Sequence, residues 1–136
     1  MRILAILGFS LLLVGCSLLE PEDLGEVTLT TGSNAYAAGE DAEVRLENTS
    51  GGVIEFGALA CVAFERHDGN DWVLIESLRV CTANLHTLQV GEALDTTILL
   101  DASLVPGRYR LVHRVYRDIT EDEGVVIYSN PFEIRS

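Results

Sequence analysis

Arginine side chains form the densest group of chemically capable residues in this 136-residue chain. Arg108, Arg110, Arg114 and Arg117 lie within ten residues of one another. In an extended strand successive side chains alternate between the two faces, so Arg108, Arg110 and Arg114 share one face. Such a row can bind carboxylates or other anions, which makes these three residues candidate partner-binding residues. The alternative is that they pair with acidic residues of a neighbouring strand.

A second group of polar side chains is acidic. Asp118, Glu121, Asp122 and Glu123 lie in the segment 118–124, which ends at a glycine. Oxygen-rich loops can hold Ca²⁺, which takes about six to eight oxygen ligands. The spacing differs from that of an EF-hand, however, and an acidic hairpin tip is the alternative that the sequence leaves open.

The sequence lacks the short motifs that carry catalysis or cofactor binding. It contains no GxSxG elbow, HExxH helix or glycine-rich phosphate loop. His67, His86 and His113 do not have the spacing of a metal-ligand set. The chain has no lysine, which excludes Schiff-base chemistry. We therefore expect a protein that is not an enzyme and that holds no cofactor or metal.

The charge balance restricts the class of partner. The chain has nine arginines and 21 acidic residues, and its formal net charge is −12. A charge of this sign repels the phosphate backbone, so nucleic acid is not expected as a partner.

Cys16 ends an apolar run that begins directly after the positively charged Arg2. The run is shorter than the roughly 20 residues of a membrane-spanning helix, and its layout is that of a secretory signal. Residues 13–16, LVGC, resemble the lipobox of bacterial lipoproteins. The resemblance implies that residues 1–15 are a cleaved signal peptide and that Cys16 is lipidated on its sulfur and its new amino terminus. An ordinary signal peptide with an incidental cysteine is the alternative.

The residues after the lipobox predict how the protein is held. Residues 16–25 carry Pro21 and several acids without a base, which is typical of a short solvated tether. Residues 26–136 then form one domain of ordinary size. We expect a lipid-anchored protein of the bacterial cell envelope, on the periplasmic face of an outer membrane or on the cell surface.

If Cys16 is lipidated, two cysteines remain. Export places Cys61 and Cys81 in an oxidising compartment, where a disulfide between them is the default expectation. Closing a loop of about 20 residues stabilises a fold by roughly 3 kcal/mol in the chain-entropy model. A pair of buried free thiols is the alternative.

Alternation of apolar and polar residues predicts strands along the rest of the chain. Asp68 and Gly69 tolerate turn conformations and predict a hairpin between the strands that flank them. Short strands separated by turn residues indicate an all-β antiparallel sandwich. The expected strands cover 26–31, 41–48, the region of 54–56, 60–66, 71–77, 78–82, 86–90, 94–100, 108–118, 125–130 and 131–136.

Several landmarks together resemble a bacterial immunoglobulin-like domain. They are Tyr36 and Gly39, the stretch NTSGG, Cys61 with Phe64-Glu65-Arg66, Trp72, Cys81, PGRYRL at 106–111 and SNPFEI at 129–134. The resemblance implies an immunoglobulin-like sandwich, a class without a shared catalytic activity. The closeness of the two cysteines in sequence implies a staple that flanks a hairpin or joins neighbouring strands. We expect Trp72 to lie in the core rather than to act as a surface anchor.

These observations favour a lipid-anchored envelope module that binds a partner or has a structural role, without enzymatic activity. An envelope protein or a glycan is the expected partner. The alternative is an inhibitor of a protease or other hydrolase, with GGVIEFG (51–57) as the exposed inhibitory loop. A secreted hydrolytic enzyme is a third class, and it requires a reactive nucleophile.

Overall fold

Apolar and polar residues alternate along the central strand of the first sheet. In the computed structural model, which describes residues 26–76, 81 and 84–136, Asp41–Asn48 form strand β3 with exposed and buried residues alternating along most of its length. Ala42, Val44 and Leu46 point inward and are buried, because neighbouring side chains of a strand face opposite sides of the sheet. The strand predicted over 41–48 is confirmed with the same bounds.

The first sheet, sheet A, has three antiparallel strands. β1 (Val27–Thr31) and β8 (Ala93–Leu99) flank β3 in the order β1-β3-β8. Leu46 lies opposite Leu29 on one side and opposite Leu94 on the other. Cross-strand apolar pairs of this kind fix the register of a half-buried sheet.

The second sheet, sheet B, is built around the ten-residue strand β9 (Gly107–Tyr116). One side of β9 pairs with β10 (Val125–Tyr128) and then with β11 (Phe132–Arg135). The other side pairs with β4 (Ile54–Gly57) and then with β5 (Ala63–Asp68). Three further strands extend the sheet: β7 (Leu85–Leu88) beside β4, β6 (Asp71–Ile75) beside β5, and β2 (Ala35–Ala37) parallel to β11.

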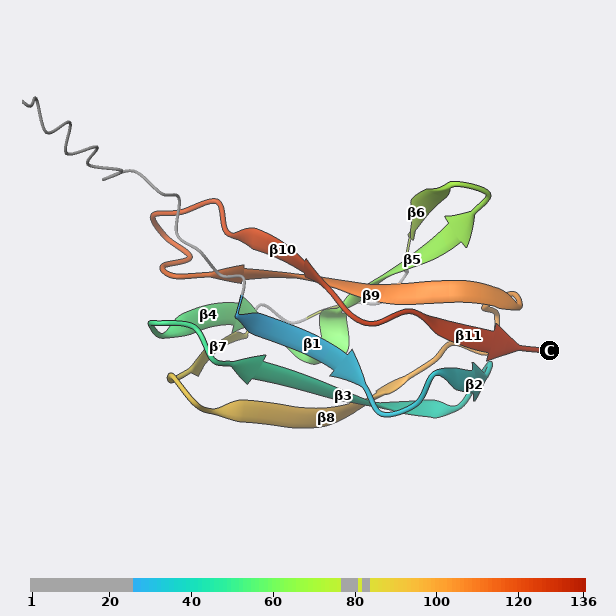
Figure 1. Ribbon diagram of the computed structural model, residues 1–136, viewed down its shortest axis with the longest axis horizontal. Coiled ribbons are helices and arrows are strands. Elements are labelled where there is room, and N and C mark those ends of the chain that lie inside the picture. The colour runs from blue at the N-terminus through green and yellow to red at the C-terminus, as the bar shows by residue number, and fades with distance from the viewer. Residues whose placement is uncertain (1–25, 77–80, 82–83) are drawn as a thin grey trace, which may run out of the picture.

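The two sheets pack face to face around one core (Figure 1). Tyr109 and Phe132 stack with ring centroids 6.3 Å apart, and Tyr36 meets Phe132 edge-on at 5.8 Å. Burying an aliphatic or aromatic side chain of this size contributes about 1.5–3 kcal/mol. The predicted all-β sandwich is confirmed. The largest fully buried apolar side chains are Tyr109, Phe56, Phe132, Leu46, Ile54, Leu100, Leu111, Val44, Val62 and Val115.

A disulfide closes the base of the predicted hairpin. Cys61 lies at the end of a short 3-10 helix, η1 (Leu59–Cys61), just before β5, and it is bonded to Cys81, which follows β6. The pairing and the hairpin-flanking staple expected from the sequence are both present. Gly69 has φ +64° and supplies the positive φ of the two-residue turn between β5 and β6.

Some expectations differ from the structure or fall outside it. Residues 35–37 form β2 beside the carboxyl-terminal strand, in a region where no strand was expected. Apart from Cys81, which is not in a strand, the strand expected over 78–82 lies outside the described residues. So does the region 1–25, with the expected signal peptide, Cys16 and the expected tether.

Candidate partner-binding surface

Strand β9 separates its side chains as the sequence predicted. Tyr109, Leu111 and Val115 point into the core and are almost fully buried. The arginines occupy the alternate positions and therefore lie on the outer face of sheet B. Arg108 and Arg114 are exposed, whereas Arg110 is half-buried.

Arg110 is held by a cross-strand ion pair. Its register partner on β5 is Glu65. The Nε and Nη2 atoms of Arg110 lie 2.7 Å and 2.6 Å from the same carboxylate oxygen of Glu65. The alternative in which an arginine of this row pairs with an acid of the neighbouring strand is therefore right for Arg110.

The guanidinium of Arg110 also lies between two aromatic rings. Its central carbon is 3.8 Å from the ring centroid of Tyr128 on β10 and 4.4 Å from that of Trp72 on β6. Trp72 in turn contacts His67 edge-on, with centroids 5.0 Å apart. Cations over ring faces attract the negative π-face. These four residues, His67, Trp72, Arg110 and Tyr128, are called the outer-face stack below.

The outer-face stack corrects the expectation for Trp72. Trp72 is half-buried on the outside of sheet B and is not part of the core. The physical reason is that Trp72 lies on the outer side of sheet B, next to Arg110, whereas the core lies between the two sheets. Tyr128 keeps 47% of its surface exposed.

The other two candidate arginines do not converge with Arg110 on one ligand position. Arg108 lies opposite Glu133 of β11, beside a shallow hollow of 360 Å³ that Asn34 and Asn130 also line. Arg114 donates a hydrogen bond of 2.7 Å to the carbonyl of Glu123. Arg114 lies six positions after Arg108 on the strand, which corresponds to a distance of about 20 Å. The three arginines therefore mark an extended surface and not a single anion pocket.

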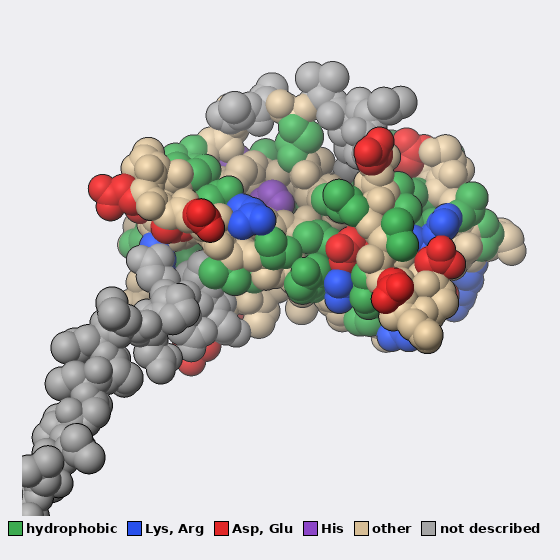
Figure 2. Space-filling model, turned by 90° about the horizontal axis from the view of Figure 1, so that it is seen from above, with side chains coloured by type: hydrophobic (Ala, Val, Ile, Leu, Met, Phe, Trp, Pro, Cys, Tyr) green, Lys and Arg blue, Asp and Glu red, His purple; other side chains and the backbone are tan. Residues whose placement is uncertain are grey.

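Arginines are unevenly divided between the two sheets. Within the described residues, the strands of sheet A carry Arg45 as their single arginine, among the acids Asp41, Glu43, Glu47 and Asp95. The strands of sheet B carry Arg66, Arg108, Arg110, Arg114 and Arg135. In the view of Figure 2 most basic side chains gather toward one end of the molecule, which is the end where the chain terminates in Figure 1. Sheet B thus carries most arginines of the described strands, alongside the acids Glu55, Glu65, Asp68, Asp71 and Glu133.

Sheet A has a polar groove of 660 Å³ on its outer face. Arg45 lies in it, bonded to Asp95 at 2.8 Å and to Glu47 at 3.3 Å. Threonine side chains supply much of the remaining lining, and no aromatic ring takes part. Arg110 on sheet B is paired within the chain as well, but the groove on sheet A offers no aromatic ring, so it is a weaker candidate than the outer face of sheet B.

The acidic segment 118–124 uses its carboxylates to order its own backbone. Asp122 accepts hydrogen bonds from the backbone N–H groups of Arg117, Asp118 and Gly124. Asp118 accepts from the hydroxyl and the N–H of Thr120, which lowers the pKa of Asp118. Among the residues that the structure describes, no group of three or more His, Cys, Asp or Glu side chains is arranged to hold a metal ion.

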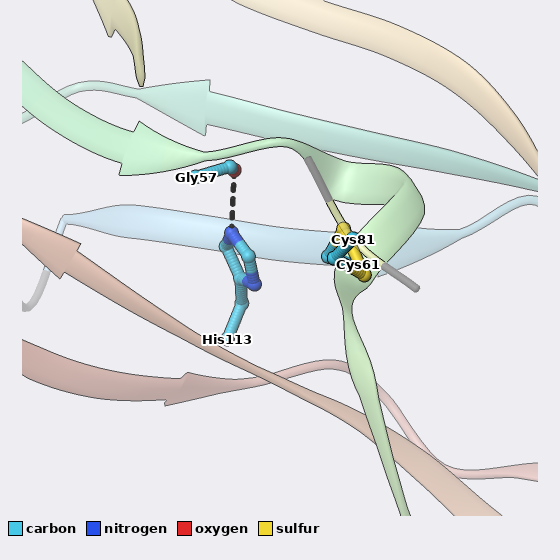
Figure 3. Close-up of a disulfide and its surroundings, with 4 residues drawn as sticks. All are labelled: Gly57, Cys61, Cys81 and His113. Atoms are coloured by element: carbon cyan, nitrogen blue, oxygen red, sulfur yellow. Dashed lines mark hydrogen bonds between the residues drawn. A yellow bond between two sulfur atoms is a disulfide. The ribbon is translucent and has the colours of Figure 1, made fainter. Parts of the chain in front are cut away.

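His113 is the histidine of β9 that faces inward. Its Nε2 atom lies 2.9 Å from the carbonyl oxygen of Gly57 on β4, so this nitrogen carries the proton and donates (Figure 3). Burial lowers the pKa of His113, and the hydrogen bond to Gly57 opposes this shift in part.

The segment proposed as an inhibitory loop is largely a strand. Ile54 and Phe56 belong to β4 and are fully buried, so GGVIEFG does not present them to a target enzyme. Gly52, which precedes the strand, is held by Arg117, whose Nη1 donates to its carbonyl at 2.7 Å. The expectation of an exposed apolar loop at 51–57 is therefore wrong for Ile54 and Phe56, whereas Val53, directly before β4, is 38% exposed.

Sequence reasoning missed Glu65 and Tyr128 as members of the candidate surface. Both lie outward on strands that flank β9, but a sequence does not show which strands become neighbours. The available signal was the alternation of β10, which places Ile127 inward and Tyr128 outward.

Comparison with known proteins agrees with this architecture. No helix in the described part of the chain is long and apolar enough to cross a membrane. A search among curated proteins gave no significant match. The family model for the bacterial Ig-like domain matches residues 23–127, most of the chain. The chain therefore belongs to the bacterial Ig-like domain family.

Proposed function

We propose that this protein is a lipid-anchored binding module of the bacterial cell envelope, without enzymatic activity, and that it contacts its partner with the outer face of sheet B. The observation that carries the proposal is the outer-face stack, in which Arg110 lies between Trp72 and Tyr128. Tryptophan, tyrosine and arginine are the residue types that most often dominate binding energy at interfaces. Rigid aromatic side chains also lose little conformational entropy on binding.

Within this surface the residues have different roles. Arg110 is paired with Glu65 and lies against both rings, so its role is to position the two rings. Tyr128, with nearly half of its surface free, is the principal contact. Arg108 and Arg114 flank it and favour a partner with carboxylates, because exposed charges steer association and select partners.

The end of the sandwich at which β1 begins is consistent with this role. β1 begins at one end of the sandwich, and the β5–β6 hairpin projects near the other end, where β11 terminates (Figure 1). A lipid on Cys16 would hold the molecule through residues 17–26, at the β1 end. The aromatic surface would then face away from the membrane and toward other envelope components.

The binding role is tested by chemical crosslinking in cells, followed by affinity purification and mass spectrometry of the tagged full-length protein. We expect one envelope protein to be recovered with the wild type and with Thr97→Glu, which alters the outer face of sheet A. Tyr128→Ala should reduce its recovery at least about tenfold. Equal recovery with Tyr128→Ala and wild type contradicts the assignment of the surface.

The anchor is tested separately through Cys16. Cys16→Ser should leave an unprocessed precursor and remove the lipid mass from the amino-terminal peptide. Unchanged processing together with unchanged membrane partition would exclude lipidation. An enzyme-inhibition panel on the same purified protein tests the alternative, since a hydrolase slowed at stoichiometric concentration would support an inhibitor.

A further inference from the structure

Strand β6 is an open edge of sheet B. Among the described strands it pairs with β5 alone, and the hairpin that it completes projects beyond the body of the sandwich (Figure 1). A strand edge with unpaired N–H and C=O groups is a template for another strand. Natural proteins shield such edges with lysine, proline, bulges or covering segments. The residues between Asp71 and Ile75 are Trp, Val and Leu, so β6 has no proline and no charge in its interior.

The turn geometry determines which backbone groups point outward. Gly69 has a positive φ and no described non-glycine residue has one, which is the pattern of a two-residue type II′ turn. In such a hairpin the closing pair, Asp68 with Asp71, is hydrogen-bonded, and bonded and non-bonded pairs then alternate. The N–H and C=O groups of Trp72 and Leu74 therefore point away from β5.

The side chains along this edge are apolar and accessible. Leu74 is 57% exposed and Val73 is 43% exposed, on opposite faces of the strand. Leu74 shares its face with Trp72 of the outer-face stack. An additional strand beside β6 would thus continue the candidate binding surface and cover apolar side chains on both faces.

Charge at the two ends of β6 indicates the kind of strand that fits. Asp71 begins the strand and the exposed Glu76 follows its last residue. Asp68 lies directly across from Asp71, an opposed pair of like charges. Arg66 of this hairpin lies on β5. Because β6 lies between β5 and the open edge, Arg66 does not neutralise the acids at that edge. A basic residue at each end of an incoming strand would offset this negative charge.

We propose that β6 receives, as an added antiparallel or parallel strand, an extended segment of a partner protein whose apolar centre is flanked by lysine or arginine. This inference rests on the proposed binding role and adds the class of partner. Main-chain hydrogen bonds to Trp72 and Leu74 supply affinity, and the flanking acids supply selectivity. A second copy of this chain fits less well, because it would bring the same acids to the same edge.

The probe for this site is a labelled synthetic peptide, acetyl-RTVTVTR-amide, titrated into the purified full-length protein by fluorescence anisotropy. Its matched control is acetyl-ETVTVTE-amide. We expect the arginine-ended peptide to bind at least about tenfold more tightly, and we expect the difference to shrink as salt screens the end charges. Equal affinity of the two peptides would overturn the proposal, as would concentration-dependent self-association that blocks the arginine-ended peptide.

Two protein variants locate the binding on β6. Leu74→Pro removes an outward N–H and should abolish binding, whereas Leu74→Thr keeps the N–H and should retain most of it. If Leu74→Pro does not fold, the double variant Asp71→Lys and Glu76→Lys tests the site instead. This variant should bind the glutamate-ended peptide more tightly than the arginine-ended peptide. An unreversed preference counts against the site.

The outcomes also separate this inference from the proposed function. A cellular partner that is lost with Tyr128→Ala but retained with Leu74→Pro leaves the binding role intact and removes the added-strand mode. Peptide binding at β6 without any specific cellular partner would instead contradict the envelope binding role.

Discussion

Arg110 donates a hydrogen bond from Nε to a carboxylate oxygen of Glu65 at 2.7 Å, and its Nη2 atom forms an ion pair with the same oxygen at 2.6 Å. The side chains are only 21% and 15% exposed, so water screens the pair weakly. The central carbon of the guanidinium also lies 4.4 Å from the ring centroid of Trp72 and 3.8 Å from that of Tyr128. The ion pair therefore joins four strands, β5, β6, β9 and β10, on the outer face of sheet B.

This pair should be stronger than a surface ion pair. A double-mutant cycle with Glu65→Gln and Arg110→Met should give a coupling free energy of about 1–3 kcal/mol, because charge-assisted hydrogen bonds in a shielded position exceed exposed ones. Urea unfolding followed by the fluorescence of Trp72, the single tryptophan, measures it. The matched control is the exposed pair Arg45 and Asp95, for which we expect less than about 1 kcal/mol. Equal coupling in the two cycles contradicts this ranking.

Two glycines with positive φ should differ in their tolerance of alanine. At Gly69 an added Cβ meets nothing within 4 Å, so Gly69→Ala should cost only the backbone strain of a positive φ, about 1–3 kcal/mol. At Gly124 the same Cβ would lie 2.7 Å from the ring of Tyr116 and 2.8 Å from the Val115 carbonyl oxygen. Gly124→Ala should therefore destabilise the fold by about 1–3 kcal/mol more than Gly69→Ala, because overpacking adds to the strain. A smaller loss at Gly124, measured by denaturation, would contradict the packing of this turn.

The disulfide should stabilise the β5–β6 hairpin region more than it stabilises the rest of the domain. Cys61 and Cys81 are 20 residues apart, and removing this cross-link should lower the free energy of unfolding by roughly 3 kcal/mol. The double variant Cys61→Ser and Cys81→Ser should also be cleaved within residues 61–81 before it is cleaved in β9, in limited proteolysis resolved by mass spectrometry. Cleavage that begins elsewhere at the same rate in both proteins would show that the hairpin does not depend on the cross-link.

His113 should make the fold less stable at acidic pH. Its pKa in the folded protein is lowered from the ordinary value of 6.5 by burial. Above that value the imidazole is neutral in both states. As the pH falls below it, the unfolded chain binds a proton that the folded chain does not, so stability decreases until the pH reaches the lowered folded pKa.

The variant His113→Phe should remove this contribution. Urea unfolding at pH 7.5 and 5.5 should show a smaller loss of stability for His113→Phe than for the wild type. His86→Gln, which alters an exposed histidine, is the control and should keep the wild-type loss. An identical loss in all three proteins would contradict the burial of His113 as the cause.

The sequence predicted those features that local alternation and turn chemistry determine. The strand over 41–48, the β5–β6 hairpin and the inward and outward faces of β9 follow from period-two patterning and from Gly69. The pairing of Cys61 with Cys81 followed from export and from the count of cysteines.

Features that depend on which strands become neighbours were not predictable. Trp72 was expected in the core because its hydrophobicity is the same whether a second sheet or solvent covers it. The short strand β2 depends on pairing with β11, almost 100 residues later, and its three residues carry little pattern of their own. The strand expected around 54–56 is confirmed as β4, but the sequence does not show that β4 lies between β7 and β9 in the sheet.

The most direct measurement of the central claim is site-specific photocrosslinking in living cells. A photoreactive amino acid replaces Tyr128 on sheet B or Thr97 on sheet A, in the chain with Cys16 and in the chain with Cys16→Ser. The account predicts one discrete adduct with an envelope protein from position 128 of the Cys16 chain, much less of it with Cys16→Ser, and none from position 97. The same adduct from both faces, or from neither, would contradict it.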